Sequence, residues 1–201
     1  EAELPLTTRL FLGLSDFLIK FWWTLPLIVF GGGALFRSLL KTERGERLWD
    51  KLILHLPIFG GLLRRLTLVE ITRTLSLLLI SGVPILDALD ITGDASGNVL
   101  FREALEKARM EVQRGESLAG PLRASEYFPP IVARMVTVGE ASGEMGEVLL
   151  KLADYFEGEA NHTISNLTTA MEPLIMIVLG VGVGFIIISI IMPIYNLTSM
   201  F

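Results

Sequence analysis

The 201-residue sequence contains no cysteine and only two histidines. The lack of cysteine excludes a disulfide framework, a thiol nucleophile and a thiolate metal site. His55 and His162 are too few and too isolated to form a histidine metal centre. No stretch alternates between apolar and polar residues with a period of two, so no strand is predicted. The sequence therefore predicts an all-α fold with no catalytic residue, no metal site and no cofactor.

Charge is also missing from one end of the chain, since residues 174–201 include no Asp, Glu, Lys or Arg. This stretch is long and apolar enough to cross a bilayer as a helix. A second apolar run covers residues 21–36, and hydrophobic residues make up 51% of the whole chain with a mean hydropathy of +0.57. We therefore expect a membrane protein with two transmembrane helices, at 21–41 and 172–198.

The cations predict the orientation of these spans. Only Arg9 and Lys20 precede the first span, and no cation follows the second. Just after the first span comes a group of five basic residues: Arg37, Lys41, Arg44, Arg47 and Lys51. The positive-inside rule then places residues 42–171 in the cytoplasm, as one domain held between two anchors. Residues 1–20 and the tail 199–201 are expected on the outer face.

The segment 1–20 has two interpretations. Arg9, Asp16 and Lys20 fall on one stripe at helical spacing, with apolar residues around them. This pattern is typical of a helix that lies at the outer interface of the membrane. It equally fits an extension of the first span whose polar stripe faces another helix.

The region 42–171 is predicted to be an antiparallel bundle of about six helices. Asn98 is a good N-cap, Gly143 a good helix end, and Glu103 is spaced to pair with Lys107. The predicted helices cover 66–81, 84–92, 98–115, a short turn from 117, 130–143, and a last helix from 145 into the second span. One apolar face of that last helix is expected to continue from Val148 to Met171.

Pro173 lies where this last helix enters the second span. Proline removes one backbone donor and crowds the preceding turn, so a kink is expected there. The functional interpretation is a mechanical joint between domain and membrane, and the alternative is an ordinary tilt that fits the helix to its neighbours. The adjacent Glu172 can be read as a proton-relay group, but anchoring at the membrane edge is favoured.

Three carboxylates, Glu140, Glu144 and Glu147, lie close together at a glycine-rich corner. Carboxylates at this spacing can hold a divalent cation or act as acid and base. Acidic residues are also favoured in the first turn of a helix, which explains Glu144 and Glu147 without chemistry. A structural or docking role for Glu140 is the favoured interpretation.

The order of several short motifs resembles the type II secretion system F family of inner-membrane platform proteins. The resemblance begins at residues 56–60, Leu-Pro-Ile-Phe-Gly, and continues to about residue 197. The residues that carry it are Gly82, Pro84, Gly115, Gly139, Glu140, Gly143, Gly146, Glu172, Pro173, Gly180, Gly184 and Pro193. It implies that these residues form structural or coupling motifs, and that the chain corresponds to the second half of such a protein.

The resemblance implies a non-enzymatic platform in the bacterial inner membrane. Its implied partners are the lipid bilayer, a cytoplasmic hexameric secretion or pilus ATPase, pilin or pseudopilin subunits and other inner-membrane assembly proteins. Small residues in the spans favour a homo-oligomer, and the net charge of −5 argues against nucleic acid. A transporter or channel subunit is the alternative, although few polar residues are there to line a path. A membrane-bound hydrolase ranks last.

Overall fold

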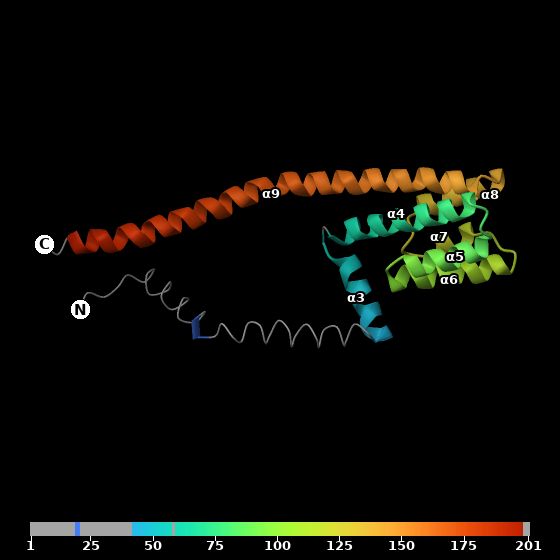
Figure 1. Ribbon diagram of the computed structural model, residues 1–201, viewed down its shortest axis with the longest axis horizontal. Coiled ribbons are helices and arrows are strands. Elements are labelled where there is room, and N and C mark those ends of the chain that lie inside the picture. Colours follow the sequence, from blue (N-terminus) through green and yellow to red (C-terminus); the bar gives the residue numbers. More distant parts are fainter. Residues whose placement is uncertain (1–18, 21–41, 58, 199–201) are drawn as a thin grey trace. The chain divides into compact units, whose positions relative to one another are not determined.

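Figure 1 shows the computed structural model of the chain, which describes residues 19–20, 42–57 and 59–198. For residues 43 and 192–198 it describes the backbone but not the side chain. The predicted span at 21–41 lies outside the described residues, as does all of the segment 1–20 except its last two residues. Helix labels follow Figure 1. Within the described part of the chain all regular structure is helical, as the sequence predicts.

Seven helices carry labels in the described residues. They are α3 (Glu43–His55), α4 (Phe59–Ile80), α5 (Ile85–Ala95), α6 (Val99–Gln113), α7 (Ala119–Ala124), α8 (Pro130–Ser142) and α9 (Met145–Thr198). α3 was not predicted from the sequence. α4 begins at Phe59, seven residues before the predicted start at residue 66. The axes of Arg44–His55 and Phe59–Ile80 differ by 111°. The α3–α4 corner is tight, because a Cβ on Gly60 would lie 2.3 Å from the carbonyl oxygen of Leu54.

Local signals place several helix ends where they were predicted. The Asn98 side chain accepts a hydrogen bond from the Leu100 amide at 3.0 Å and so caps α6. Pro130 opens α8, where its missing N–H has no helical partner to lose. Gly143 ends α8 with a φ of +75°, a left-handed conformation that glycine adopts without steric cost.

The helices up to the first part of α9 form one compact unit, Leu40–Ser165. Its core gathers apolar side chains from α4 to α9 around Phe101, which is fully buried and packs edge-on against Phe128 with ring centroids 5.4 Å apart. α4 runs antiparallel to the first part of α9. Arg73 pairs with Asp154 and Glu157 at 3.2 and 2.8 Å, and Arg65 lies 3.7 Å from Glu159.

The structure corrects one expectation about the bundle. Glu103 does not pair with Lys107; its carboxylate lies 3.2 Å from Arg47 of α3, because the fold brings this guanidinium within reach. The apolar face of α9 is buried only as far as Ala160. Ile164 and Met171 continue the predicted apolar face beyond this point and are 43% and 49% exposed.

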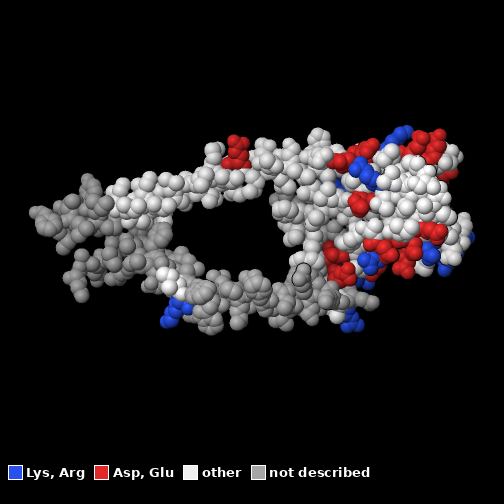
Figure 2. Space-filling view, in the orientation of Figure 1, with Lys and Arg blue, Asp and Glu red and all other residues white. Residues whose placement is uncertain are grey.

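Beyond the bundle, α9 continues without interruption past Pro173 to Thr198. The joint expected at Pro173 is therefore not a break in the helix. By length and composition this is the one described helix that can span a membrane, with an 18-residue window of mean hydropathy 3.0 of which none is buried. α3 and α4 pass the same test only as a bent pair. Figure 2 shows charged side chains over the bundle and none on the described end of α9.

Candidate functional site

The glycine-rich corner between α8 and α9 contacts the end of α4. The Ser76 hydroxyl donates a hydrogen bond to the Gly146 carbonyl oxygen at 2.6 Å. A Cβ on Gly146 would lie 2.6 Å from Cγ1 of Ile80, closer than real Cβ atoms approach. Gly146 is thus the residue that lets α9 start directly against α4.

This contact brings a second motif to the same end of the bundle. Ile80 is the last residue of α4, and Gly82 and Pro84 follow it in the turn to α5. The amide of Gly82 bonds to the carbonyl of Leu79 at 3.1 Å, and Pro84 precedes the first residue of α5. The α4–α5 turn and the start of α9 therefore meet at Ile80.

Glu140 connects a third motif to this corner. Its carboxylate accepts hydrogen bonds from the Leu118 amide, at 2.6 Å, and from the Ser117 hydroxyl. Both donors belong to the turn between α6 and α7, which contains Gly115. The Ser117 hydroxyl in turn accepts a hydrogen bond from the Ala119 amide at 3.1 Å, so Ser117 and Glu140 together cap the start of α7.

Gly139 and Gly143 lie on either side of Glu140 in the sequence and shape the corner between α8 and α9. A Cβ on Gly139 would lie 3.0 Å from Cα of Met145, so a larger residue would push the start of α9 a few tenths of an ångström away from the end of α8. We call the residues that meet here the motif end of the bundle. They are Ile80, Gly82, Pro84, Gly115, Ser117, Gly139, Glu140, Gly143 and Gly146.

The carboxylates at this corner do not converge. Glu140 faces the α6–α7 turn, whereas Glu147 lies in the first turn of α9 and Glu144 just before it. Among the described residues, no three carboxylate or histidine side chains are placed to hold a metal ion together. The arrangement positions hydrogen-bond acceptors for backbone amides and suits a structural clamp.

The remaining motif residues lie elsewhere, along the second part of α9. Glu172 is the last charged residue of the chain, and Pro173 follows it. A Cβ on Gly180 or Gly184 would meet nothing within 4 Å, so these positions leave an open, thin helix surface. Pro193 has helical backbone near the end of α9. The structure therefore separates the motif residues into a bundle set and a set in the apolar helix.

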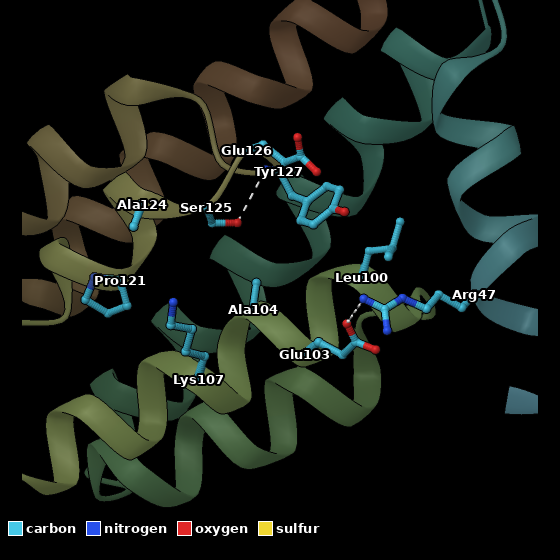
Figure 3. A pocket seen from close by; sticks show the side chains of 10 residues that line it. All are labelled: Arg47, Leu100, Glu103, Ala104, Lys107, Pro121, Ala124, Ser125, Glu126 and Tyr127. Atoms are coloured by element: carbon cyan, nitrogen blue, oxygen red, sulfur yellow. Dashed lines mark hydrogen bonds and ion pairs between the residues drawn. The ribbon is translucent and has the colours of Figure 1, made fainter. Parts of the chain in front are cut away.

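The bundle also carries an open groove that the sequence analysis missed. It has a volume of about 450 Å³ and is lined by α3, α6, α7 and the loop after α7. In Figure 3, Arg47 and Glu103 point toward each other on one side, and Lys107 lies farther along α6. Burial raises the pKa of the Tyr127 hydroxyl, which lines the same groove. No local sequence pattern signals this groove, because its walls come from distant segments.

Comparisons with known proteins fit this arrangement. The family model described as type II secretion system (T2SS), protein F matches residues 71–193. Type IV pilus assembly protein PilC from Pseudomonas aeruginosa is 40% identical over 198 residues, 98% of this chain and 53% of that protein. PilC from Thermus thermophilus is also 40% identical, over 98% of this chain and 48% of that protein. Type II secretion system protein F from Aeromonas hydrophila is 33% identical, over 98% of this chain and 51% of that protein.

The chain thus spans about half the length of the curated relatives it matches. The family model covers the motif end of the bundle and most of the apolar part of α9, from Ile71 within α4 to Pro193. These matches fall on the features that the geometry singles out. The chain belongs to the type II secretion system protein F family.

Proposed function

We propose that this chain is part of a platform protein that anchors a helical bundle in the bacterial inner membrane and transmits motion through it. The single observation that carries the proposal is α9, one uninterrupted helix. Its first part contributes Leu149 and Leu152 to the bundle core, each 1% exposed. Its later part is free of charge and exposed, with Val181 at 67%. A helix shared in this way couples movement of the bundle to the membrane directly.

The contacts of the bundle support a rigid coupling. Arg73 of α4 pairs with Asp154 and Glu157 of α9 at the exposed surface of the bundle. Arg64 donates to the Tyr127 carbonyl at 2.9 Å and fixes α4 to the loop before α8. Each exposed ion pair adds little stability alone. Together with the buried core, these contacts would restrict movement of α4 relative to the first part of α9.

The proposed topology follows the sequence signals. Residues 21–41 and 172–198 would be the two spans, and residues 42–171 would form the cytoplasmic domain, as the cations after residue 36 favour. Residues 1–20 and 199–201 would lie on the outer face. In this proposed topology a cytoplasmic hexameric ATPase would meet the bundle side. Pilin or pseudopilin subunits, further copies of this chain and other inner-membrane assembly proteins would contact the spans.

The protein would act as a scaffold and not as an enzyme. The motif end joins its helices by hydrogen bonds and close glycine contacts, which suits a joint that transmits force. Catalysis would need a nucleophile and a base in one pocket. The groove beside Glu103 offers an ion pair and a tyrosine instead.

A gene deletion tests the proposal. The strain without the protein should lose its pili or its secretion, while the purified motor ATPase keeps its activity. Complementation with the intact gene should restore assembly. Normal assembly in the deletion strain would contradict the proposed role. Copurification from a mild detergent extract, with a pilus or a secretion ATPase, decides which machine the protein serves.

A further inference from the structure

The rotation of α3 about its own axis is set by polar contacts with α6. The Asp50 carboxylate accepts a hydrogen bond from the Val99 amide at 2.7 Å, at the first residue of α6. Arg47 pairs with Glu103 one turn further along α6. Both contacts use the same side of α3, so the opposite side is held away from the bundle.

That outward side carries an apolar stripe. Leu48 is 70% exposed and Leu52 is 58% exposed, and the two are one helical turn apart. Leu56, at the end of the helix, and Phe59, just past the corner, continue the exposed surface at 43% and 58%. We call Leu48, Leu52 and Leu56 with their flanking cations Arg44 and Lys51 the outer face of α3.

The charges on α3 are sorted between its two sides. Arg44 and Lys51 lie four residues before and three residues after Leu48, so they flank the stripe on the outer face, and both are exposed. Asp50 is turned toward α6, and Glu46 lies on the far side because two residues rotate a helix by about 200°. Leucines flanked by cations are the pattern of a helix that lies at a membrane surface.

The position of α3 suits such a surface. α3 begins seven residues after the apolar run that ends at residue 36, and Arg37 and Lys41 stand between them. The α3–α4 corner also lies at the end of the bundle from which α9 continues, since Arg65 of α4 donates to the Thr163 hydroxyl of α9 at 3.3 Å.

We propose that the outer face of α3 lies in the headgroup layer of an anionic lipid leaflet and fixes the tilt of the bundle against the membrane. This inference rests on the membrane topology proposed above. Anionic headgroups match Arg44 and Lys51, and the leucines reach the acyl boundary. A second copy matches poorly, because a two-fold contact would bring the same cations of both chains together. Three leucines also offer much less than the roughly 800 Å² per partner of a stable interface.

The cysteine-free chain allows a direct test by site-directed spin labelling. Full-length Leu52→Cys, labelled and reconstituted in vesicles of phosphatidylethanolamine and phosphatidylglycerol, should collide more with oxygen than with a water-soluble nickel chelate. Met110→Cys, an exposed apolar site on α6, is the matched control and should show the reverse. Val181→Cys marks the lipid interior. A water-like Leu52 beside a lipid-like Val181 would overturn this inference and leave the platform proposal standing.

Other outcomes of the labelling experiment also test the membrane topology and the lipid contact of α3. A water-like Val181 would mean that the proposed membrane topology itself is wrong. Dipolar broadening of the Leu52 signal, from a second label nearby, would assign the face to another copy of the chain and overturn the lipid proposal. Arg44→Gln or Lys51→Gln, added to Leu52→Cys, should reduce the ratio of lipid-exposed to water-exposed label about fivefold each in the anionic vesicles. Equal effects in phosphatidylcholine vesicles would contradict the role of headgroup charge.

Discussion

The two parts of α9 have the same secondary structure and opposite surroundings. In the bundle part, Leu149 and Leu152 are each 1% exposed, and Asp154 and Glu157 meet an arginine of α4. In the apolar part, Ile177 and Val181 are 63% and 67% exposed, and no residue beyond Glu172 is charged. The first part is stabilised by protein neighbours. The second has apolar side chains all round the helix, which only lipid or another apolar helix can cover.

Because protein neighbours stabilise the bundle part of α9, truncating a core leucine there should have the largest effect on the free energy of unfolding. Leu152→Ala should lower the free energy of unfolding by about 2–5 kcal/mol, because it leaves a cavity in a packed core. Urea unfolding of the full chain in detergent measures this loss. Leu150→Ala, two residues away and 37% exposed, is the control and should change it by less than about 0.5 kcal/mol. Equal losses from both variants would mean that the bundle does not pack around α9.

In the apolar part of α9 a charged side chain should be costly where another apolar side chain is not. Val183→Arg should disfavour membrane insertion by about 2.5–3.5 kcal/mol, the cost of arginine near the centre of a span. A glycosylation-based insertion assay measures the inserted fraction. Val183→Leu should insert like the native chain. If Val183→Arg inserts as well as Val183→Leu, the second part of α9 does not cross the bilayer alone.

Two glycines of the bundle part offer a matched pair. Gly146→Ala should destabilise the bundle by about 1–3 kcal/mol, since its Cβ would meet Ile80. Gly158→Ala, where a Cβ meets nothing within 4 Å, should stabilise it by about 0.5–1 kcal/mol. Thermal unfolding of both variants gives the two signs. Adding Ile80→Ala to Gly146→Ala should recover part of the loss, and an additive double variant would speak against the close contact.

The Glu140 clamp should contribute less than the core. Glu140→Ala should cost about 1–2 kcal/mol, because the Leu118 amide and the Ser117 hydroxyl lose their charged acceptor. Hydrogen exchange at the Leu118 amide should also accelerate. Glu144→Ala is the control, since no hydrogen bond of its carboxylate occurs in the part of the chain that the structure describes. An unchanged hydrogen-exchange rate at Leu118 in Glu140→Ala would mean that Glu140 does not protect this amide.

The smallest expected effect is a pH dependence at α3. Burial raises the pKa of the Asp50 carboxyl, although its hydrogen bond from Val99 acts in the opposite direction. The folded state therefore binds the proton more tightly. The contribution of Asp50 to stability is fully present below its unfolded pKa of about 3.9 and is lost as pH rises through the raised folded value. The unfolding midpoint of the native chain should fall relative to that of Asp50→Asn as pH rises through this range. A native midpoint that instead rises relative to that of Asp50→Asn toward neutral pH would contradict the sign.

Local features of this fold were predictable from sequence, and tertiary ones were not. The Asn98 cap, the Pro130 start and the Gly143 end depend on residues a few positions apart, so sequence patterns identify them. α3 is an exception, since its leucines and charged residues recur at helical spacing and this local pattern was not recognised as a helix. The Glu103–Lys107 pair was wrong because Arg47, more than fifty residues before Glu103 in the sequence, pairs with the Glu103 carboxylate in the fold.

The candidate site shows the same division. The glycine-rich corner was recognisable from its spacing, and the family resemblance followed from the order of the motifs. Its meeting with Ile80 and Ser117 was not recognisable, because these contacts join segments distant in the sequence. The apolar part of α9 was the simplest prediction, since composition alone marks a helix that no protein core has to cover.

Labelling with a membrane-impermeant maleimide tests the central claim most directly, because the native chain has no cysteine to interfere. Single-cysteine variants Lys151→Cys and Val181→Cys place one probe in each part of α9, both at exposed positions. The account predicts that Lys151→Cys reacts in inverted inner-membrane vesicles and not in intact cells. Val181→Cys should react in neither until detergent is added. Reaction of Val181→Cys in intact membranes, or of Lys151→Cys from outside the cell, would contradict it.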